Sequence, residues 1–244
     1  MKRVYSDLHL CPNVRNGEQI KQMMQKASEL GYTLVAVSLP QNFSEQKIQE
    51  MRDICKITNM DFVSRVDLKP RRGYDLTRSL RQLRRRFEIV AVMCESKHVA
   101  RQAAKDRRTD LLNFPSYNRW RRFFDKAEAE LASNTLASLE VDVTPLLILE
   151  NRERIKFLSV LRKEVAIAED FHVPIIISSG ASNELYMRGP REVAALASLF
   201  DLDKLSAKKA VSENPMAIVV RNRQKLNSKF VAPGIRVIRR GKGC

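Results

Sequence analysis

"SDLHL", at residues 6–10, is the first of seven short apolar runs that recur along the whole chain. Helix-like segments separate these runs from end to end, without a Gly/Ser-rich linker, a low-complexity tract or an exact repeat. Strands that alternate with helices in this way predict an α/β fold with a parallel sheet. The expected strands are Val4–Leu10, Leu34–Leu39, Phe62–Val66, Ile89–Cys94, Asp110–Asn113, Ser138–Val143 and Ile175–Ser179.

The spacing of the strands favours a closed barrel over an open sheet. Parallel strands are joined by right-handed crossovers, and 244 residues is a normal length for one α/β barrel. No Gly-x-Gly-x-x-Gly motif follows the first strand, which counts against a dinucleotide-binding fold. We therefore predict a TIM-barrel-like (β/α) barrel of seven parallel strands. Its helices are expected at Glu18–Leu30, Ser44–Asn59, Asp75–Phe87, Lys97–Lys105, Trp120–Ser133 and Arg152–Phe171.

The pattern changes after Ser179, where no eighth strand is evident. Pro190 opens one helix, Leu205–Val211 forms a second, and Pro215 starts a third. We expect these helices to close the barrel. The chain is thus predicted to be a single TIM-barrel-like domain over residues 1–226, followed by a basic C-terminal tail over 227–244.

The charge of the chain is strongly positive and unevenly distributed. Forty-four Lys and Arg residues face 28 Asp and Glu residues, which gives a net charge of +16. Three windows, 65–86, 97–122 and 221–244, hold more positive charge than the whole chain, so the remainder is net negative. A patchy basic surface favours a polyanionic partner. A surface adapted to an unusual cytoplasm is the alternative.

The segment "DLTRSLRQLRRRF", at residues 75–87, places its arginines on one face of the expected helix. On a helical wheel, four apolar residues form one stripe, which predicts the buried face. Arg78, Arg81 and Arg85 lie roughly opposite, without acids to pair them. Such a face suits phosphate groups. An ordinary solvated helix face is the alternative.

Further basic runs lie close in sequence to this helix. "KPRRGY" ends the third strand, "KDRR" precedes the fifth, and "YNRWRRFF" follows it. Arginine and aromatic side chains together can hold phosphates and stack on unpaired bases, although at least two of Trp120, Phe123 and Phe124 are expected in the core. The candidate RNA-binding residues are Lys69, Arg71, Arg72, Arg78, Arg81, Arg85, Arg107, Arg108, Arg119, Arg121, Arg122 and Arg188.

Acidic residues and one histidine fall at the expected carboxyl ends of strands, where the sites of α/β barrels lie. They are Asp7 and His9, then Asp67, Glu95 and Asp142. This placing resembles the polymerase-and-histidinol-phosphatase superfamily, in which a His-x-His motif on the first strand and further histidines bind two or three metal ions.

The histidines needed for such a metal cluster are missing. Leu10 replaces the second histidine of the motif, and His9, His98 and His172 are the only three in the chain. Three histidines so placed do not supply a hydrolytic ligand set. We therefore expect no bound metal and no catalytic residue. Asp7 and His9 are vestigial metal candidates, or hydrogen-bonded residues at a strand end.

Other functional classes lack support in the sequence. No Gly-x-Ser-x-Gly elbow or activated-cysteine motif occurs, and the four cysteines form no Cys-x-x-Cys pair. "SSGAS", at 178–182, suggests a loop where a helix, or alternatively a phosphate, packs closely. No apolar run of about 18 residues and no signal-peptide pattern is present. We expect a cytoplasmic protein without membrane contact.

The C-terminal half carries a more specific resemblance. "ISSGA" on the last strand and "YMRGPREVAALASLFDL…AKKAVSENPMAIV", together with "SDLHL" on a metal-poor barrel, resemble the archaeal ribonuclease P protein component 3 family. The eukaryotic counterpart of that family is the thirty-kilodalton subunit of ribonucleases P and MRP. The resemblance covers most of the chain and is strongest from residue 177 to about 223.

The resemblance implies a protein subunit of a ribonucleoprotein that matures the 5′ end of tRNA. Catalysis would belong to the RNA, which would use magnesium, and this chain would hold no cofactor. The implied partners are ribonuclease P RNA, protein component 2, the other ribonuclease P protein subunits, and precursor tRNA through the holoenzyme. A metal-dependent phosphoesterase on the same barrel is the alternative. The basic tail is longer than the family leads us to expect, so its role is not implied.

Overall fold

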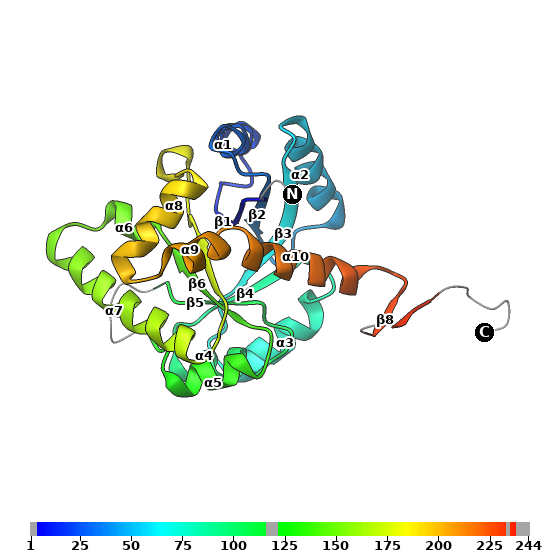
Figure 1. Cartoon of the computed structure of the whole chain (residues 1–244). Helices are drawn as coiled ribbons and strands as arrows, with labels where there is room; N and C mark the ends of the chain where they lie inside the picture. The colour runs from blue at the N-terminus through cyan, green and yellow to red at the C-terminus, as the bar shows by residue number, and fades with distance from the viewer. Residues whose placement is uncertain (1–3, 116–121, 233–234, 238–244) are drawn as a thin grey trace.

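The computed structural model describes residues 4–115, 122–232 and 235–237. Seven parallel strands, hydrogen-bonded in chain order, form a nearly closed barrel inside a ring of helices (Figure 1). The predicted α/β barrel of seven parallel strands is confirmed. The strands are β1 (Ser6–Leu10), β2 (Leu34–Leu39), β3 (Asp61–Leu68), β4 (Ile89–Met93), β5 (Leu111–Asn113), β6 (Ser138–Asp142) and β7 (Ile175–Ser178).

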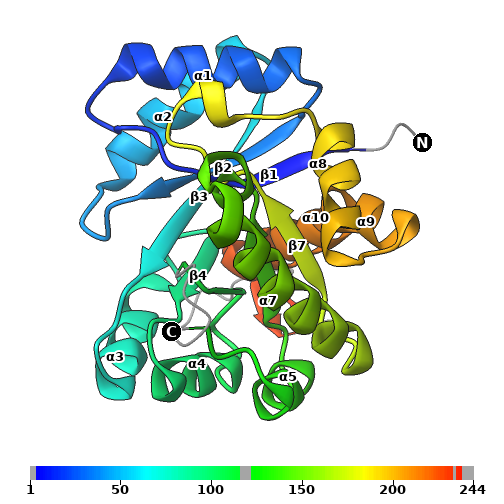
Figure 2. The same cartoon turned by 90° about the vertical axis from the view of Figure 1, so that its left-hand side faces the viewer.

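The helices cover the outside of the barrel. Figure 2 shows α1 and α2 on one side of the strands, and α3, α4 and α5 on the opposite side. None of the helices in the described ranges is long and apolar enough to cross a membrane. They are α1 (Gly17–Glu29), α2 (Glu45–Ile57), α3 (Gly73–Leu83), α4 (Lys97–Ala104), α5 (Lys126–Ser133), α6 (Thr144–Ile148), α7 (Asn151–Asp170), η2 (Glu184–Tyr186), α8 (Pro190–Leu196), η3 (Ala197–Phe200), α9 (Lys204–Ala210) and α10 (Glu213–Leu226).

Two helical predictions need correction. The helix expected over Trp120–Ser133 begins only at Lys126, because the Asp125 carboxylate accepts the Glu128 N–H at 2.9 Å and caps the first turn. The residues just before this cap, 122–125, are not helical. The short helix α6, which has Pro145 in its first turn, was not expected.

Two apolar clusters divide the core between the inside and the outside of the barrel. The interior cluster contains one face of the strands, for example Leu8, Val63 and Ile176, together with Ile218 and Val219 of α10. The larger outer cluster packs the opposite strand face against the surrounding helices. Alternation along each strand produces this division, since successive side chains point to opposite faces.

Strand β1 breaks this alternation through a β-bulge. Asp7 pairs with Val35 and Leu10 with Val37, so β1 has one residue more than β2 between the two pairs. As a consequence, Leu8 lies in the interior cluster but Leu10 lies in the outer one. Two residues that simple alternation would place on one face are thus separated.

The loop after β7 closes the barrel against β1. The Gly180 N–H donates to the His9 carbonyl at 3.0 Å, and the Cys11 N–H donates to the Ala181 carbonyl at 2.8 Å. Gly180 has φ +64°, and a Cβ there would lie 2.9 Å from the Asp142 side chain. Glycine is therefore required on both conformational and steric grounds. The "SSGAS" loop thus joins β7 to β1, and the Gln19 side chain of α1 donates to its Ser182 carbonyl at 2.9 Å.

Helix α10 covers the amino-terminal mouth of the barrel. Its Ile218 and Val219 enter the interior cluster, and its polar side chains bind groups at the start of strands. Asn222 donates to the Glu88 carbonyl at 2.8 Å, and Arg223 pairs with Asp61 at 2.7 Å. The predicted closure of the barrel by a C-terminal helix is confirmed.

After α10, the chain forms a small antiparallel hairpin that the sequence did not indicate. It consists of β8 (Phe230–Ala232) and β9 (Ile235–Arg236). Figure 1 shows β8 outside the ring of helices, beyond the end of α10. The division into a domain of 1–226 and a tail of 227–244 stays a prediction.

The contribution of α10 to stability can be tested at two nearby positions that differ in burial. Ile218 is 3% exposed, whereas Val220 is 44% exposed. We expect Ile218→Ala to lower the free energy of unfolding by about 2–5 kcal/mol, because it leaves a cavity in the barrel interior. Val220→Ala should change it by no more than about 0.5 kcal/mol. Denaturant unfolding of both variants measures this, and equal effects would contradict the interior position of Ile218.

Candidate functional site

A buried guanidinium group lies near the carboxyl end of the barrel. The Arg65 side chain projects from β3 and is 0% exposed. Its Nη1 and Nη2 atoms donate to the two Glu140 carboxylate oxygens at 2.6 and 2.7 Å, and its Nε donates to Asp67 Oδ1 at 2.7 Å. Burial alone would lower the pKa of Arg65, but the Asp67 and Glu140 carboxylates outweigh burial and raise it.

His9 adds a second cation to this cluster. Its Nδ1 lies 2.8 Å from Asp142 Oδ1, and its Nε2 lies 3.3 Å from Asp67 Oδ2. Burial and the charge of Arg65 oppose protonation, yet the two carboxylates raise the pKa of His9 well above its ordinary value. Both ring nitrogens of His9 thus lie against a carboxylate of the cluster.

The remaining acceptors of the three carboxylates are also used. The Asn113 amide donates to Glu140 and to Asp142, at 2.9 Å in each case. Ser178 donates to Glu140 at 2.8 Å, and the Ser38 hydroxyl donates to Asp67. Every carboxylate oxygen of the cluster thus accepts a hydrogen bond or an ion pair. We call these side chains the rim cluster: His9, Ser38, Arg65, Asp67, Asn113, Glu140, Asp142 and Ser178.

The rim cluster does not fit a divalent metal ion, although His9, Glu140 and Asp142 place one ligand atom each within 4.8 Å of one another. A metal requires an imidazole with a free lone pair, whereas both His9 nitrogens already face carboxylates, Asp142 at 2.8 Å and Asp67 at 3.3 Å. The Glu140 oxygens already hold the Arg65 guanidinium, whose charge would repel a second cation.

The side chain of Asp7 does not belong to this cluster. The Asp7 Oδ1 atom accepts the N–H groups of His9 at 3.1 Å and Ser179 at 3.0 Å. Burial raises the pKa of Asp7. The bulge in β1 explains the separation, because it turns His9, but not Asp7, toward Asp67 and Asp142. Of the two vestigial metal candidates, only the His9 side chain lies next to Asp67 and Asp142.

Arg122 is another correction, since its side chain is buried rather than available to RNA. It is 3% exposed and pairs with Glu164 through two nitrogens, the longer contact being 2.9 Å. Its guanidinium also lies over the Phe114 and Phe157 rings. A buried ion pair of this kind holds α7 against the segment that precedes α5. Nearby, Phe124 is buried and Phe123 is partly buried, whereas Trp120 lies outside the described residues.

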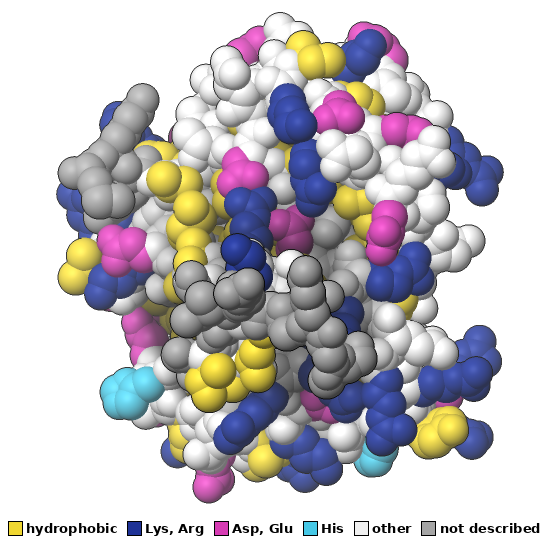
Figure 3. Space-filling model, turned by 90° about the vertical axis from the view of Figure 1, so that its right-hand side faces the viewer, with side chains coloured by type: hydrophobic (Ala, Val, Ile, Leu, Met, Phe, Trp, Pro, Cys, Tyr) yellow, Lys and Arg dark blue, Asp and Glu magenta, His cyan; other side chains and the backbone are white. Residues whose placement is uncertain are grey.

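The outer surface of α3 and the segment before it form what we call the basic flank. Its side chains are exposed, and the described residues offer them no ion-pair partner: Lys69, Arg71, Arg72, Arg78, Arg81 and Arg85. Leu76, Leu80, Leu83 and Phe87 are buried beneath it, as the helical wheel predicts. Figure 3 shows Lys and Arg side chains gathered over the lower part of one face, with few acidic side chains among them.

The other candidate RNA-binding residues differ in availability. Arg107 is exposed in the loop between α4 and β5. Arg108 beside it pairs with Asp106 at 2.6 Å, and Arg188 donates to the carbonyls of its own loop. Arg119 and Arg121 lie outside the described residues. The structure therefore gathers the candidates on and near α3, with Arg188 as a separate member.

The rim cluster contains residues that the sequence reasoning missed. Arg65 and Glu140 were not proposed for any role. A signal was present, because each charged residue lies inside an apolar strand at a position of the inward-facing register. Charged residues are rarely buried unless they are paired. Two opposite charges at such positions predict an ion pair across the barrel.

A further buried acid, Glu128, lies in α5 outside the rim cluster. It is 0% exposed, and neither of its carboxylate oxygens has a hydrogen-bond partner among the residues that the structure describes. Burial, followed by the charge of Asp125, raises the pKa of Glu128 from 4.5 to about 8. The folded chain then binds more protons than the unfolded chain between these values, so its stability falls as pH rises through this range.

We therefore expect Glu128→Gln to remove this pH dependence. The free energy of unfolding of the variant, relative to the original chain, should increase by about 3 kcal/mol between pH 5 and pH 8. Glu130→Gln, on the exposed side of the same helix, should show no such increase. Denaturant unfolding at several pH values measures both differences. If the free energy of unfolding changed with pH in the same way for Glu128→Gln and the original chain, the raised pKa of Glu128 would be contradicted.

Curated relatives match nearly the full length of the chain. A protein named ribonuclease P protein component 3, from Methanosarcina barkeri, is 26% identical over 234 residues. The match covers 96% of this chain and 95% of the relative.

Solved structures match the barrel. A chain in a cryo-EM structure of archaeal ribonuclease P with mature tRNA has a TM-score of 0.84 at 23% identity, with 96% of this chain and 99% of that chain covered. A probable 2-pyrone-4,6-dicarboxylic acid hydrolase from Acinetobacter baumannii has a TM-score of 0.59 at 11% identity, with coverage of 88% and 99%. At these identities the likeness shows the shared fold.

The family assignment rests on a match that spans most of the chain. The family model described as RNase P subunit p30 matches residues 4–227. This range includes the rim cluster, the basic flank and helix α10. The resemblance read from the sequence is confirmed, and the chain belongs to the RNase P subunit p30 family.

Proposed function

We propose that this chain binds the RNA of ribonuclease P and supports its catalysis without carrying out the chemistry itself. Membership of the p30 family makes the chain a protein subunit of ribonuclease P. The observation that carries the finer proposal is the basic flank, where six exposed cations lie on α3 and the segment before it, none with an ion-pair partner among the described residues. Phosphate contacts from Arg and Lys provide much of the affinity of proteins for nucleic acid.

The rim cluster supports the non-catalytic part of the proposal. General acid-base catalysis needs a group that can accept or deliver a proton, and metal catalysis needs open ligand positions. The carboxylates of the cluster are held by Arg65 and His9 instead. The alternative function, a metal-dependent phosphoesterase on the same barrel, would need the donor atoms that these cations occupy.

The proposed partners follow from the family and from the solved assembly. The archaeal structure that the chain resembles is described as ribonuclease P with mature tRNA. We therefore assign ribonuclease P RNA, component 2, the other protein subunits and, through the holoenzyme, precursor tRNA as partners. The chain would bind no cofactor, and magnesium would serve the RNA. A cytoplasmic location stays a prediction.

Reconstitution of the enzyme tests whether this chain supports cleavage by the RNA without cleaving precursor tRNA itself. We expect the purified chain alone to leave precursor tRNA intact, since no group in its described residues is placed to activate water. With ribonuclease P RNA and component 2, addition of the chain should increase the rate of 5′-end cleavage. Gel analysis of the products measures both results. Cleavage by the chain in the absence of RNA would contradict the proposal.

The salt dependence of RNA binding tests the basic flank. We expect the triple change Arg78→Ala, Arg81→Ala and Arg85→Ala to weaken binding of ribonuclease P RNA. It should also make the fall of log affinity with log salt less steep, by about 2 in the magnitude of the slope, because three phosphate contacts no longer release counterions. The fold should remain, since these side chains point away from the buried leucines.

A second triple variant controls for net charge. Lys21, Arg152 and Lys163 are exposed on α1 and α7, away from α3. Changing all three to Ala removes the same charge and should leave the salt slope nearly unchanged. Equal slopes for the two triple variants would show that the basic flank has no special part in RNA binding.

A further inference from the structure

A basic groove lies at the foot of the basic flank, between the end of α3, the loop before β5, and the chain that leaves α10. Its volume is about 510 Å³. We call it the tail-side groove. Five cations from these three segments line it together with the Phe230 ring of β8: Arg84, Arg85, Arg107, Arg108 and Lys225.

The positive charge of the tail-side groove is incompletely neutralised. Asp110 is the only acid among the described residues that line it, and this carboxylate already pairs with Arg84 and with Arg221, the latter at 3.0 Å. Arg85 and Arg107 have no ion-pair partner among the described residues. Burial and the charge of Arg221 lower the pKa of Lys225. The groove thus offers an anion several donors at once.

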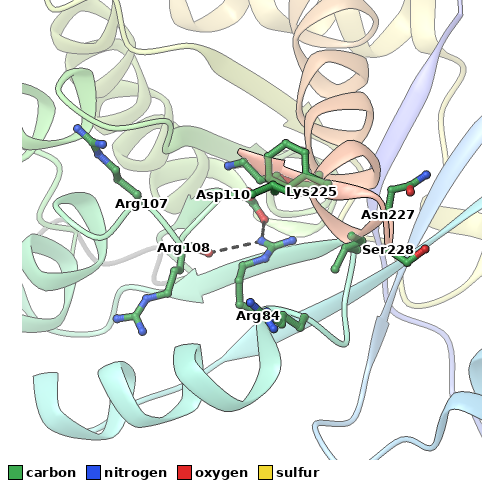
Figure 4. Close-up of a pocket in the computed structure, with 12 residues that line it drawn as sticks. Arg84, Arg107, Arg108, Asp110, Lys225, Asn227 and Ser228 are labelled. Carbon is green, nitrogen blue, oxygen red and sulfur yellow. Dashed lines mark hydrogen bonds and ion pairs between the residues drawn. The ribbon is translucent and has the colours of Figure 1, made fainter. Parts of the chain in front are cut away.

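The groove also holds its central cation rigidly. Arg84 donates to the Glu88 carbonyl at 2.8 Å and to the Phe87 carbonyl at 3.0 Å, in addition to its pair with Asp110. Figure 4 shows Arg107 and Arg108 on one side of Arg84, with Asn227 and Ser228 on the other. Arg84 therefore forms a fixed part of the groove floor, and the neighbouring cations are the ones available to a ligand.

The size and lining of the groove favour single-stranded over double-stranded nucleic acid. A cavity of this volume accepts a ligand of the size of one or two nucleotides and excludes a double helix, whose body is far wider. Phe230 supplies the aromatic surface on which an unpaired base stacks, while the cations bind its phosphates. Backbone phosphates of a duplex would need only an exposed basic surface.

We propose that the tail-side groove binds an unpaired, single-stranded segment of RNA, with phosphates at Arg85, Arg107 and Lys225 and a base against Phe230. The inference rests on the proposed function, because it assumes that the anionic partner is RNA. It adds a second contact of a different kind to the basic flank. It also gives the C-terminal hairpin a role as one wall of a binding site.

Binding of fluorescent oligonucleotides to the full chain tests this proposal. The probes are a single-stranded oligouridylate, an RNA duplex of similar length, and a polyglutamate peptide of similar charge. The variants are the pair Arg107→Ala and Lys225→Ala, and separately Phe230→Leu. The pair Lys21→Ala and Lys163→Ala removes the same charge from α1 and α7 as a control. Circular dichroism and thermal unfolding verify that each variant is folded.

We expect the pair Arg107→Ala and Lys225→Ala to reduce oligouridylate affinity about tenfold or more. The magnitude of the slope of log affinity against log salt should fall by about 1.4, because two phosphate contacts are lost. Phe230→Leu should reduce the affinity at least about fivefold without changing the slope, because stacking involves no counterion. The duplex should respond less than oligouridylate to both changes.

Several outcomes would overturn the inference. One is equal effects of the groove pair and the control pair. Another is preferential binding of polyglutamate at the groove, which would make it a docking site for an acidic protein. If the groove variants still bind ribonuclease P RNA and oligouridylate like the original chain, only the inference fails. If the original chain, with component 2 present, does not bind ribonuclease P RNA, the proposed function itself fails.

Discussion

The pairing of Arg65 with Glu140 and Asp67 is the interaction on which the carboxyl end of the barrel depends. Three acids converge there from β3 and β6, and such a group is stable only when cations neutralise it. Arg65 and His9 supply that charge from within the chain. Removing one partner from a buried pair of this kind costs about 3–5 kcal/mol, since the remaining charge is left unpaired.

This internal neutralisation distinguishes the barrel interior from the outer surface. At the carboxyl end of the barrel, Arg65 and His9 hold the carboxylates of Asp67, Glu140 and Asp142. On the basic flank, and at Arg85 and Arg107 of the tail-side groove, cations are exposed and have no ion-pair partner among the described residues. Arginine thus occurs in two opposite environments in this chain, as a buried counter-ion and as an exposed cation, and we propose that the exposed cations bind phosphate.

The sequence predicted the features that depend on local pattern. The alternation of apolar runs with helix-like segments located all seven strands. The helical wheel correctly assigned the buried leucines and exposed arginines of α3. It failed where distant segments decide the outcome. Arg122 is buried because α7 supplies Glu164. The groove depends on contact between α10 and the loop before β5, which no local pattern shows.

Metal analysis of the purified protein tests the central claim most directly. The chain would be dialysed against zinc, manganese or iron, freed of excess ion, and examined by elemental mass spectrometry. The account predicts clearly substoichiometric metal, because Arg65 and His9 already occupy the carboxylates that an ion would need. One equivalent of metal per chain, lost when His9 or Asp142 is changed, would contradict it.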